Sequence, residues 1–195
     1  MSVAVTLRAA IRSPFKALSV SRALLKGQLC RLSCRMRGVR FECGRNLRVY
    51  GKLSIVGPGL VRFGDDVVVD MVVTPWTYDP GATIEVGDGT YLNGTQFGCA
   101  RHIAIGARSI LARASVMDTN FHSTAVDRHE SGASVKVAPV HIGSNVWVAA
   151  NVGILPGTMI GDNSVVGFGA VCSGSYPANA LIATARATVV RQLDE

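Results

Sequence analysis

The amino-acid sequence predicts an all-β solenoid, a parallel β-helix, because a hydrophobic residue recurs at every sixth position through the C-terminal half. An α-helix repeats about every 3.6 residues and a free strand every 2, so neither produces a period of six. A coil of short strands with tight corners does, because one aliphatic side chain of each strand points to the axis. These positions are Ile142, Val148, Ile154, Ile160, Val166 and Cys172.

Two further observations favour the same fold. The residue after most of these positions is small, as a corner requires: Gly143, Ala149, Gly161, Gly167 and Ser173, with Leu155 as the exception. The residue four places on is small or β-branched: Val146, Val152, Thr158, Ser164 and Ala170. Aromatic residues make up only 6% of the chain, whereas glycine occurs 21 times, which suits a narrow aliphatic core with sharp corners.

Residues 1–40 are expected to form a basic helical segment outside the solenoid. Residues 1–48 hold eleven basic residues and one acidic residue, a net charge of +10, whereas the remainder holds nine and twelve, a net charge of −3. Apolar residues recur at roughly helical spacing, which predicts helical pieces at 3–12 and 15–35, with Pro14 as the interruption.

Two compatible roles for this segment stay open. It is a helical cap that shields the end of the solenoid, or a basic amphipathic element that associates weakly with an anionic membrane surface. Nucleic acid is not an expected partner, because neither interleaved aromatic residues nor a binding motif accompanies the charge.

The solenoid is expected to occupy residues 41–182. The six-residue step begins at Val49. A second ladder is offset from Val86 by one extra residue, which predicts a bulge or bend near 98–104; its members are Ile105, Leu111 and Met117. Residues 72–83 break the rhythm and are expected to be irregular.

The longest interruption is the polar stretch 118–139, which separates two regular ladders. A solenoid accommodates an insertion of this length as a loop that projects from a corner, and such loops often carry function. Residues 183–195 are expected to form a separate C-terminal segment.

The composition favours a cytoplasmic protein. No apolar run approaches the ~18–20 residues needed to span a bilayer, and Arg8, Arg12 and Lys16 interrupt the apolar stretches that a signal peptide needs. The five cysteines are scattered and lack zinc-finger spacing, so we expect reduced thiols. Cys172 lies on the core ladder and should act as a small hydrophobe.

An ordered set of motifs in residues 84–191 connects the chain to a known family. The motifs are Asn93 after a Gly-Asp corner, His122 in the loop, Pro-Val-x-Ile-Gly-x-x-Val-Trp from Pro139 to Trp147, Ile-x-Pro-Gly-x-x-Ile-Gly-Asp-Asn from Ile154 to Asn163, and Pro177. In this combination the sequence resembles the hexapeptide-repeat O-acetyltransferases, which include galactoside, maltose and polysaccharide acetyltransferases.

The resemblance implies a left-handed parallel β-helix with a short C-terminal helix. It implies acetyl-coenzyme A (acetyl-CoA) as the donor and a hydroxyl of a sugar or polysaccharide precursor as the acceptor. It also implies a homotrimer with active sites between neighbouring subunits, so that loop 118–139 faces an adjacent coil.

Acetyl transfer to a sugar hydroxyl needs a base, because the alcohol is a poor nucleophile until its proton is taken. A histidine, with an ordinary pKa of about 6.5, suits this role near neutrality, and the resemblance assigns it to His122. Asp118, the nearest acid in the sequence, is expected to fix the tautomer. Asn93 maps to the family's acceptor-positioning Asn, and a corner residue in the left-handed conformation is the alternative.

The resemblance also assigns a donor site. The oxyanion that forms on the thioester needs donors already in place, and a backbone N–H of the corner near Ala149 is the expected source. Acetyl-CoA is expected along the coil edge near Ala149, Phe168 and Arg186. Trp147 either covers the acyl-donor groove or fills a gap at a corner.

The C-terminal motif departs from the family's pattern. The family usually has a Lys two residues after a core position and Gly-Asn-Pro-Ala-Lys beyond the late Pro, whereas this chain has Gly174 and Thr184-Ala185-Arg186-Ala187-Thr188. Arg186 is expected to compensate by binding a phosphate. The alternatives to an enzyme are a solenoid without catalysis that serves as a scaffold, and a membrane-surface accessory protein.

The remaining histidines, His102, His129 and His141, are expected to be surface residues. The four histidines are 20, 7 and 12 residues apart, which does not predict a tight pair on adjacent corners, so no metal is expected. Asp127 and Arg128 either contact the acceptor or only solvate the loop.

Overall fold

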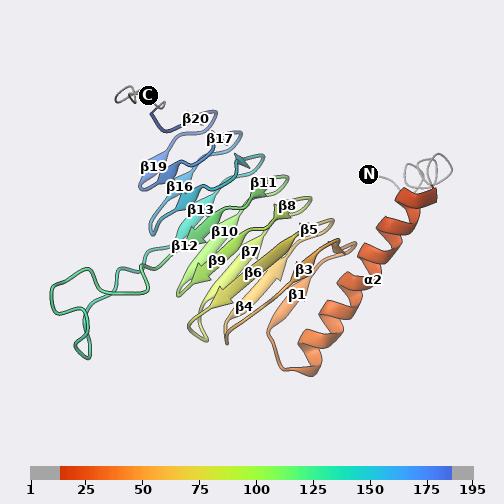
Figure 1. The fold of residues 1–195 in the computed structure, drawn as a ribbon, viewed down its shortest axis with the longest axis horizontal. Coiled ribbons are helices and arrows are strands. Elements are labelled where there is room, and N and C mark those ends of the chain that lie inside the picture. Colours follow the sequence, from red (N-terminus) through yellow and green to blue (C-terminus); the bar gives the residue numbers. More distant parts are fainter. Residues whose placement is uncertain (1–13, 186–195) are drawn as a thin grey trace, which may run out of the picture.

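The computed structural model describes residues 14–185, which form a solenoid of three parallel sheets capped by one helix (Figure 1). The first sheet contains β1 (Phe41–Cys43), β4 (Leu60–Phe63), β7 (Thr83–Val86), β10 (His102–Ile105), β13 (Val140–Ile142), β16 (Met159–Ile160) and β19 (Ser175–Tyr176). The second contains β2 (Arg48–Val49), β5 (Val68–Asp70), β8 (Tyr91–Asn93), β11 (Ile110–Ala112), β14 (Trp147–Val148), β17 (Val165–Val166) and β20 (Leu181–Ile182). The third contains β3 (Lys52–Leu53), β6 (Val72–Thr77), β9 (Gln96–Cys99), β12 (Ser115–Met117), β15 (Gly153–Ile154) and β18 (Val171–Cys172).

Successive strands pass from the first sheet to the second and then to the third, so each coil of the chain adds one strand to each face of a triangular prism. Every pairing between neighbouring coils within the sheets is parallel. The predicted left-handed parallel β-helix is confirmed.

The predicted core ladder is also confirmed. All six positions from Ile142 to Cys172 are buried, and so are the small or β-branched residues four places after each of the first five. The two polar residues among these, Thr158 and Ser164, satisfy their hydroxyls on backbone carbonyls: Thr158 Oγ1 donates to Leu155 O at 2.7 Å, and Ser164 Oγ donates to Pro177 O at 3.1 Å. Burial therefore leaves neither hydroxyl without a partner.

Two expectations about the N-terminal coils were wrong. Residues 72–77 form β6, the longest strand of the described chain, so only 78–82 are irregular. Pro75 fits this strand because its carbonyl still accepts a hydrogen bond from Val56 N–H at 3.0 Å. Met117 is only half-buried, and the residue that enters the core is Val116. The step from Leu111 to the next core residue is therefore five residues rather than six. The sequence pattern did not reveal this, because Val116 and Met117 are both apolar. The predicted bend near 98–104 corresponds to the corner between β9 and β10.

The helix α2 (Pro14–Met36) lies across the N-terminal end of the solenoid (Figure 1). Its Ala23 and Cys34 are buried, and a side chain at Gly27 would collide with the carbonyl of Leu47. Helix and first coil are therefore in close contact, and the predicted helix at 15–35 is confirmed. The predicted helix at 3–12 and the predicted C-terminal helix lie outside the described residues.

Residues 118–139 form a loop that projects from the solenoid between β12 and β13, as predicted (Figure 1). Its base is closed by an isolated bridge between Thr119 and Val137. No helix of the described chain is both long enough and apolar enough to cross a membrane.

Candidate active site

Two edges of the prism carry the predicted site residues. We call the corners between the second and third sheets the Asn93 edge; its corner residues are Met71, Gly94, Arg113, Ala150 and Phe168. Backbone hydrogen bonds run along this edge from coil to coil: Arg113 N–H donates to Asn93 O at 2.6 Å, and Gly169 N–H donates to Ala150 O at 3.1 Å. The corners between the third and first sheets form the loop edge, from which residues 118–139 project.

Asn93 is the last residue of β8 and lies in a polar network. Asn93 Nδ2 donates to Tyr91 Oη at 3.3 Å, and Tyr91 Oη donates to Asp70 Oδ2 at 2.9 Å. Burial, reinforced by Asp70, raises the pKa of Tyr91 above its usual value. The left-handed alternative for Asn93 is wrong, since the corner conformation with φ of 63° falls on Gly94.

This network leaves one atom of Asn93 without a partner. Asn93 Oδ1 is shielded from solvent and accepts no hydrogen bond from residues 14–185. A buried polar atom of this kind carries a free-energy cost of about 1–3 kcal/mol, and native proteins tolerate it mainly where it serves a function. Because Tyr91 holds Nδ2, the amide presents its oxygen as a hydrogen-bond acceptor.

The corner after β14 corrects the expected oxyanion donor. Ala149 N–H donates to Val166 O at 2.9 Å, so it belongs to the ladder and is not free. The next N–H, that of Ala150, donates to no group within the described chain. The candidate donor is therefore Ala150 rather than Ala149.

The other predicted donor-site residues lie beside this corner. Trp147 begins β14 and is half exposed, and Phe168 is exposed at the corner of the next coil. Earlier coils of the same edge form a groove of about 460 Å³ beside Gly94 and Arg113. Sequence analysis missed Arg113, whose cation lies at this groove and had no motif to mark it. Arg186 lies outside the described residues.

Asp118 has partners that the sequence did not suggest. Its fully buried carboxylate accepts hydrogen bonds from the backbone N–H groups of Ala100, Arg101 and His102, each at 2.7 Å, and Cys99 Sγ donates to it at 3.4 Å. Burial, reinforced by this carboxylate, raises the pKa of the Cys99 thiol. None of the described hydrogen bonds joins Asp118 to His122, so Asp118 ties down the β9–β10 corner rather than the imidazole.

His122 is exposed near the base of the projecting loop, and its backbone N–H donates to Asn120 O at 2.7 Å. The preceding residue, Phe121, has a φ of 62°, which is unusual for a bulky side chain. Its ring lies on Gly98 of β9, where a Cβ would come within 2.4 Å of the Phe121 Cζ atom. This contact fixes the backbone immediately before His122.

Phe121 also belongs to an aromatic surface, which we define as Trp76, Tyr78 and Phe121; Trp76 and Tyr78 are exposed and Phe121 is half-buried. The rings of Trp76 and Tyr78 are stacked with centroids 5.4 Å apart, and Tyr78 meets Phe121 edge-on at 5.0 Å. A groove of about 230 Å³ beside these rings is also lined by the polar side chains of Thr74 and Gln96. Sequence analysis missed this surface because it treated residues 72–83 as irregular.

The expectation that no histidine pair forms on adjacent coils was wrong. The rings of His102 and His141 lie side by side with centroids 5.4 Å apart, and His102 Nδ1 is 2.6 Å from Thr83 Oγ1. The loop insertion separates the two residues by 39 positions in the sequence while leaving them one coil apart. Among residues 14–185, no group of three or more His, Cys, Asp or Glu side chains could hold a metal ion; whether the protein needs a metal stays a prediction.

The two remaining predicted residues lie in the exposed part of the loop. Asp127 and Arg128 both face solvent, and Arg128 Nε donates to Ala125 O at 3.2 Å. Within one chain, His122 at the loop edge and Asn93 at the Asn93 edge lie beyond opposite ends of β9, so one subunit does not bring these two residues together.

Comparisons with known proteins agree with this fold. Residues 139–174 match the family described as bacterial transferase hexapeptide (six repeats). A Staphylococcus aureus (strain COL) protein named as an acetyltransferase is 39% identical over 75 residues, but the match covers only 38% of this chain and 35% of that protein. WcaF of Escherichia coli K12, named as a colanic acid biosynthesis acetyltransferase, is 30% identical over 134 residues, which cover 67% of this chain and 69% of WcaF. The chain belongs to the hexapeptide-repeat acetyltransferase family.

A solved structure shows how far the shared fold extends. The polySia-specific acetyltransferase NeuO aligns with this hexapeptide-repeat acetyltransferase at a TM-score of 0.55 and 21% identity, over 78% of this chain and 81% of NeuO. The family match at 139–174 includes Trp147 and the Ala150 and Phe168 corners but neither Asn93 nor His122. Family membership therefore supports the fold of residues 139–174 more directly than it supports the loop.

Proposed function

We propose that this protein transfers an acetyl group from acetyl-CoA to a hydroxyl of a sugar or polysaccharide precursor in the cytoplasm. We propose further that the active site forms between two subunits of a homotrimer, from the loop edge of one and the Asn93 edge of its neighbour. The observation that carries this proposal is the distribution of the candidate residues: His122 and Asn93 lie at different edges of one chain. A second copy can bring the two edges together.

In the proposed reaction, His122 accepts the proton of the acceptor hydroxyl while the oxygen attacks the thioester carbonyl. Asn93 Oδ1, which has no partner among the described residues, orients that hydroxyl by accepting its hydrogen bond before the proton moves, once the amide turns this oxygen out of its shielded position toward the acceptor. The tetrahedral intermediate carries negative charge on the former carbonyl oxygen, and the N–H of Ala150, which has no partner within residues 14–185, stabilises it. Collapse expels the coenzyme A thiolate, which takes the proton from His122, and leaves the acetyl ester.

Asp118 acts in this proposal as a positioning residue. It holds the β9–β10 corner at the base of the loop, and Phe121 fixes the loop on Gly98. Together these contacts fix the position of the His122 backbone. Asp127 and Arg128 extend the loop surface that would face the acceptor.

For the donor, we propose that coenzyme A lies along the Asn93 edge, between Trp147 and Phe168, with Arg186 binding a phosphate. Both aromatic side chains are exposed at this edge and offer apolar surface to the acyl chain. Because Gly174 stands where the family usually has a lysine, the affinity for acetyl-CoA is the first quantity to measure.

For the acceptor, the aromatic surface supports a sugar. Pyranose rings present C–H groups that pack on the negative face of an aromatic ring, and their hydroxyls hydrogen-bond to polar neighbours such as Gln96 and Thr74. The names of WcaF and NeuO connect these relatives to colanic acid and polysialic acid, which agrees with a glycan acceptor.

Labelled acetyl-CoA and a panel of sugars test the activity. His122→Ala should lower turnover by about 10²–10⁴-fold, whereas His129→Ala, a matched change in the same exposed loop, should have little effect. Near-normal turnover of His122→Ala would remove His122 from the mechanism. Coenzyme A binding without turnover on any sugar would favour another acceptor, and absence of binding would favour the scaffold.

Co-expression of His122→Ala and Asn93→Ala chains tests the shared site. Each variant alone should be inactive, but every mixed trimer contains one interface with both residues intact. Random mixing of equal amounts should therefore restore about a quarter of the wild-type sites, as expected for a head-to-tail interface. No recovery in purified mixed trimers would contradict a site shared between subunits.

A further inference from the structure

The helix α2 carries a second apolar face that the solenoid does not cover. Six large apolar side chains of this helix are each more than half exposed. They are Phe15, Leu18, Leu25, Leu29, Leu32 and Met36, which we call the outer stripe. A single exposed leucine is ordinary, but a continuous row along a helix marks an interaction surface.

The outer stripe lies opposite the face that packs on the first coil. Ala23, Gly27 and Cys34 are buried on the solenoid side. At about 100° per residue, Leu25 and Leu32 are about 140–180° away from them around the helix axis. Packing on the β-helix therefore explains one apolar face of α2 and leaves the other unexplained.

Cations flank the outer stripe on both sides. By the same rotation, Arg22 and Lys26 lie along one flank, and Arg31 and Arg35 lie along the other. Residues 1–41 contain no Asp or Glu. Lys26 Nζ donates to Tyr50 O at 3.0 Å, which fastens one flank to the solenoid.

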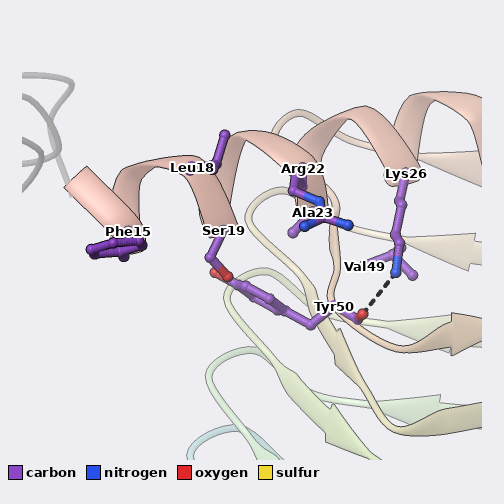
Figure 2. Close-up of a pocket in the computed structure, with 8 residues that line it drawn as sticks. All are labelled: Phe15, Leu18, Ser19, Arg22, Ala23, Lys26, Val49 and Tyr50. Carbon is purple, nitrogen blue, oxygen red and sulfur yellow. Dashed lines mark hydrogen bonds between the residues drawn. The ribbon is translucent and has the colours of Figure 1, made fainter. Parts of the chain in front are cut away.

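A polar groove opens beside this flank (Figure 2). It has a volume of about 360 Å³ and lies between α2 and the corner after β2. Arg22, Ser19 and Tyr50 line it, and Phe15 and Leu18 of the outer stripe lie at its far end. The groove therefore combines a guanidinium with a hydroxyl next to apolar side chains, a composition that matches an anionic headgroup above acyl chains.

We propose that the outer stripe docks α2 flat on an anionic membrane surface, with its leucines in the headgroup–acyl boundary and its flanking cations on lipid phosphates. An apolar row bordered by Lys and Arg is the composition of helices that lie in this interface. A second copy of α2 is a poorer occupant, because it would bring the same cations to both flanks and no carboxylate to pair with them. The helix α2 lies across the end of the solenoid (Figure 1), and its buried face, with Ala23, Gly27 and Cys34, packs on the first coil, so the outer stripe on the opposite face points away from the sheets.

Co-sedimentation of the full-length protein with vesicles tests this proposal. Phosphatidylcholine vesicles that contain phosphatidylglycerol should bind the protein at low salt, and binding should fall at high salt because each cation near the surface contributes about fivefold in affinity. Pure phosphatidylcholine vesicles should bind it at least about tenfold more weakly. Equal binding to both vesicle types, or binding to neither, would overturn the proposal.

Variants distinguish vesicle binding through the outer stripe from a general effect of surface hydrophobicity. The double change Leu25→Gln and Leu29→Gln should reduce binding to anionic vesicles by about tenfold or more, with helix content unchanged by circular dichroism. The matched control Leu181→Gln alters an equally exposed leucine at the far end of the solenoid and should bind as the wild type does. If the double change instead lowers the oligomeric mass in sedimentation velocity and leaves vesicle binding intact, a second copy covers the stripe and the proposal fails.

Discussion

Replacement of Asp118 by Asn should destabilise the protein severely, although the two side chains have nearly the same shape. The Asp118 carboxylate is fully buried and accepts three backbone N–H groups at 2.7 Å. Oδ2 serves Arg101 and His102, and Oδ1 serves Ala100. An amide has one oxygen, so in either orientation its NH₂ group faces at least one N–H donor.

The expected magnitude follows from counting these contacts. One hydrogen bond to a charged acceptor is lost, which costs about 1.5–3 kcal/mol. The other two become bonds to a neutral acceptor and lose about half their strength, or about 1 kcal/mol each. The free energy of unfolding should therefore fall by about 3–5 kcal/mol, a large share of the 5–15 kcal/mol typical of a domain.

Urea denaturation followed by circular dichroism measures this change. Asp127→Asn is the matched control, because it makes the same chemical change in the exposed part of the same loop and should alter stability by less than about 0.5 kcal/mol. A loss of less than about 1 kcal/mol in Asp118→Asn would refute the assignment of Asp118 as the residue that ties down the β9–β10 corner.

Three further predictions concern the loop base, the aromatic surface and a thiol. Gly98→Ala should displace the Phe121 ring and lower acetyl transfer while changing stability by less than about 1 kcal/mol, because the clashing atom is the end of a side chain; unchanged turnover would show that this contact does not position the loop. Trp76→Ala should raise KM for the sugar acceptor with little change in KM for acetyl-CoA, and an equal rise in both would contradict an acceptor role. Burial raises the pKa of Cys30 to about 12, so its alkylation by iodoacetamide, followed by mass spectrometry, should keep rising about tenfold per pH unit between pH 8 and 10; a plateau near pH 9 would indicate an ordinary thiol.

The fold was largely predictable because a β-helix repeats its geometry with every few residues. Each corner returns the chain to the same orientation, so the inward residue recurs at a constant step from Ile142 to Cys172. The prediction failed where two neighbouring residues could each have been the inward one, as at Val116 and Met117, both of which are apolar. It also failed at β6, where Pro75 suggested a break but its missing N–H left the carbonyl bond to Val56 intact.

The sequence motifs identified candidate residues for the site, but not the hydrogen-bond partners of these residues. The motifs pointed to Asn93, His122 and the corner after Trp147, and the projecting loop was evident from its polar composition. The sequence could not show that Ala149 N–H is already bonded within the ladder, whereas Ala150 N–H donates to no group of residues 14–185. Whether the N–H of a corner residue is bonded depends on whether its peptide group points along the solenoid axis, toward the next coil.

The sequence alone therefore determined the repeating core, the N-terminal helix and the position of the loop, because these follow from periodicity and composition within short stretches. Only the tertiary structure decided which side chains meet across coils. Stacking in a solenoid pairs residues one full coil apart, and that distance in sequence changes with every insertion. This is why the pairing of His102 with His141, across 39 positions, and the burial of Asp118 against the β9–β10 corner appear only once the coils are stacked.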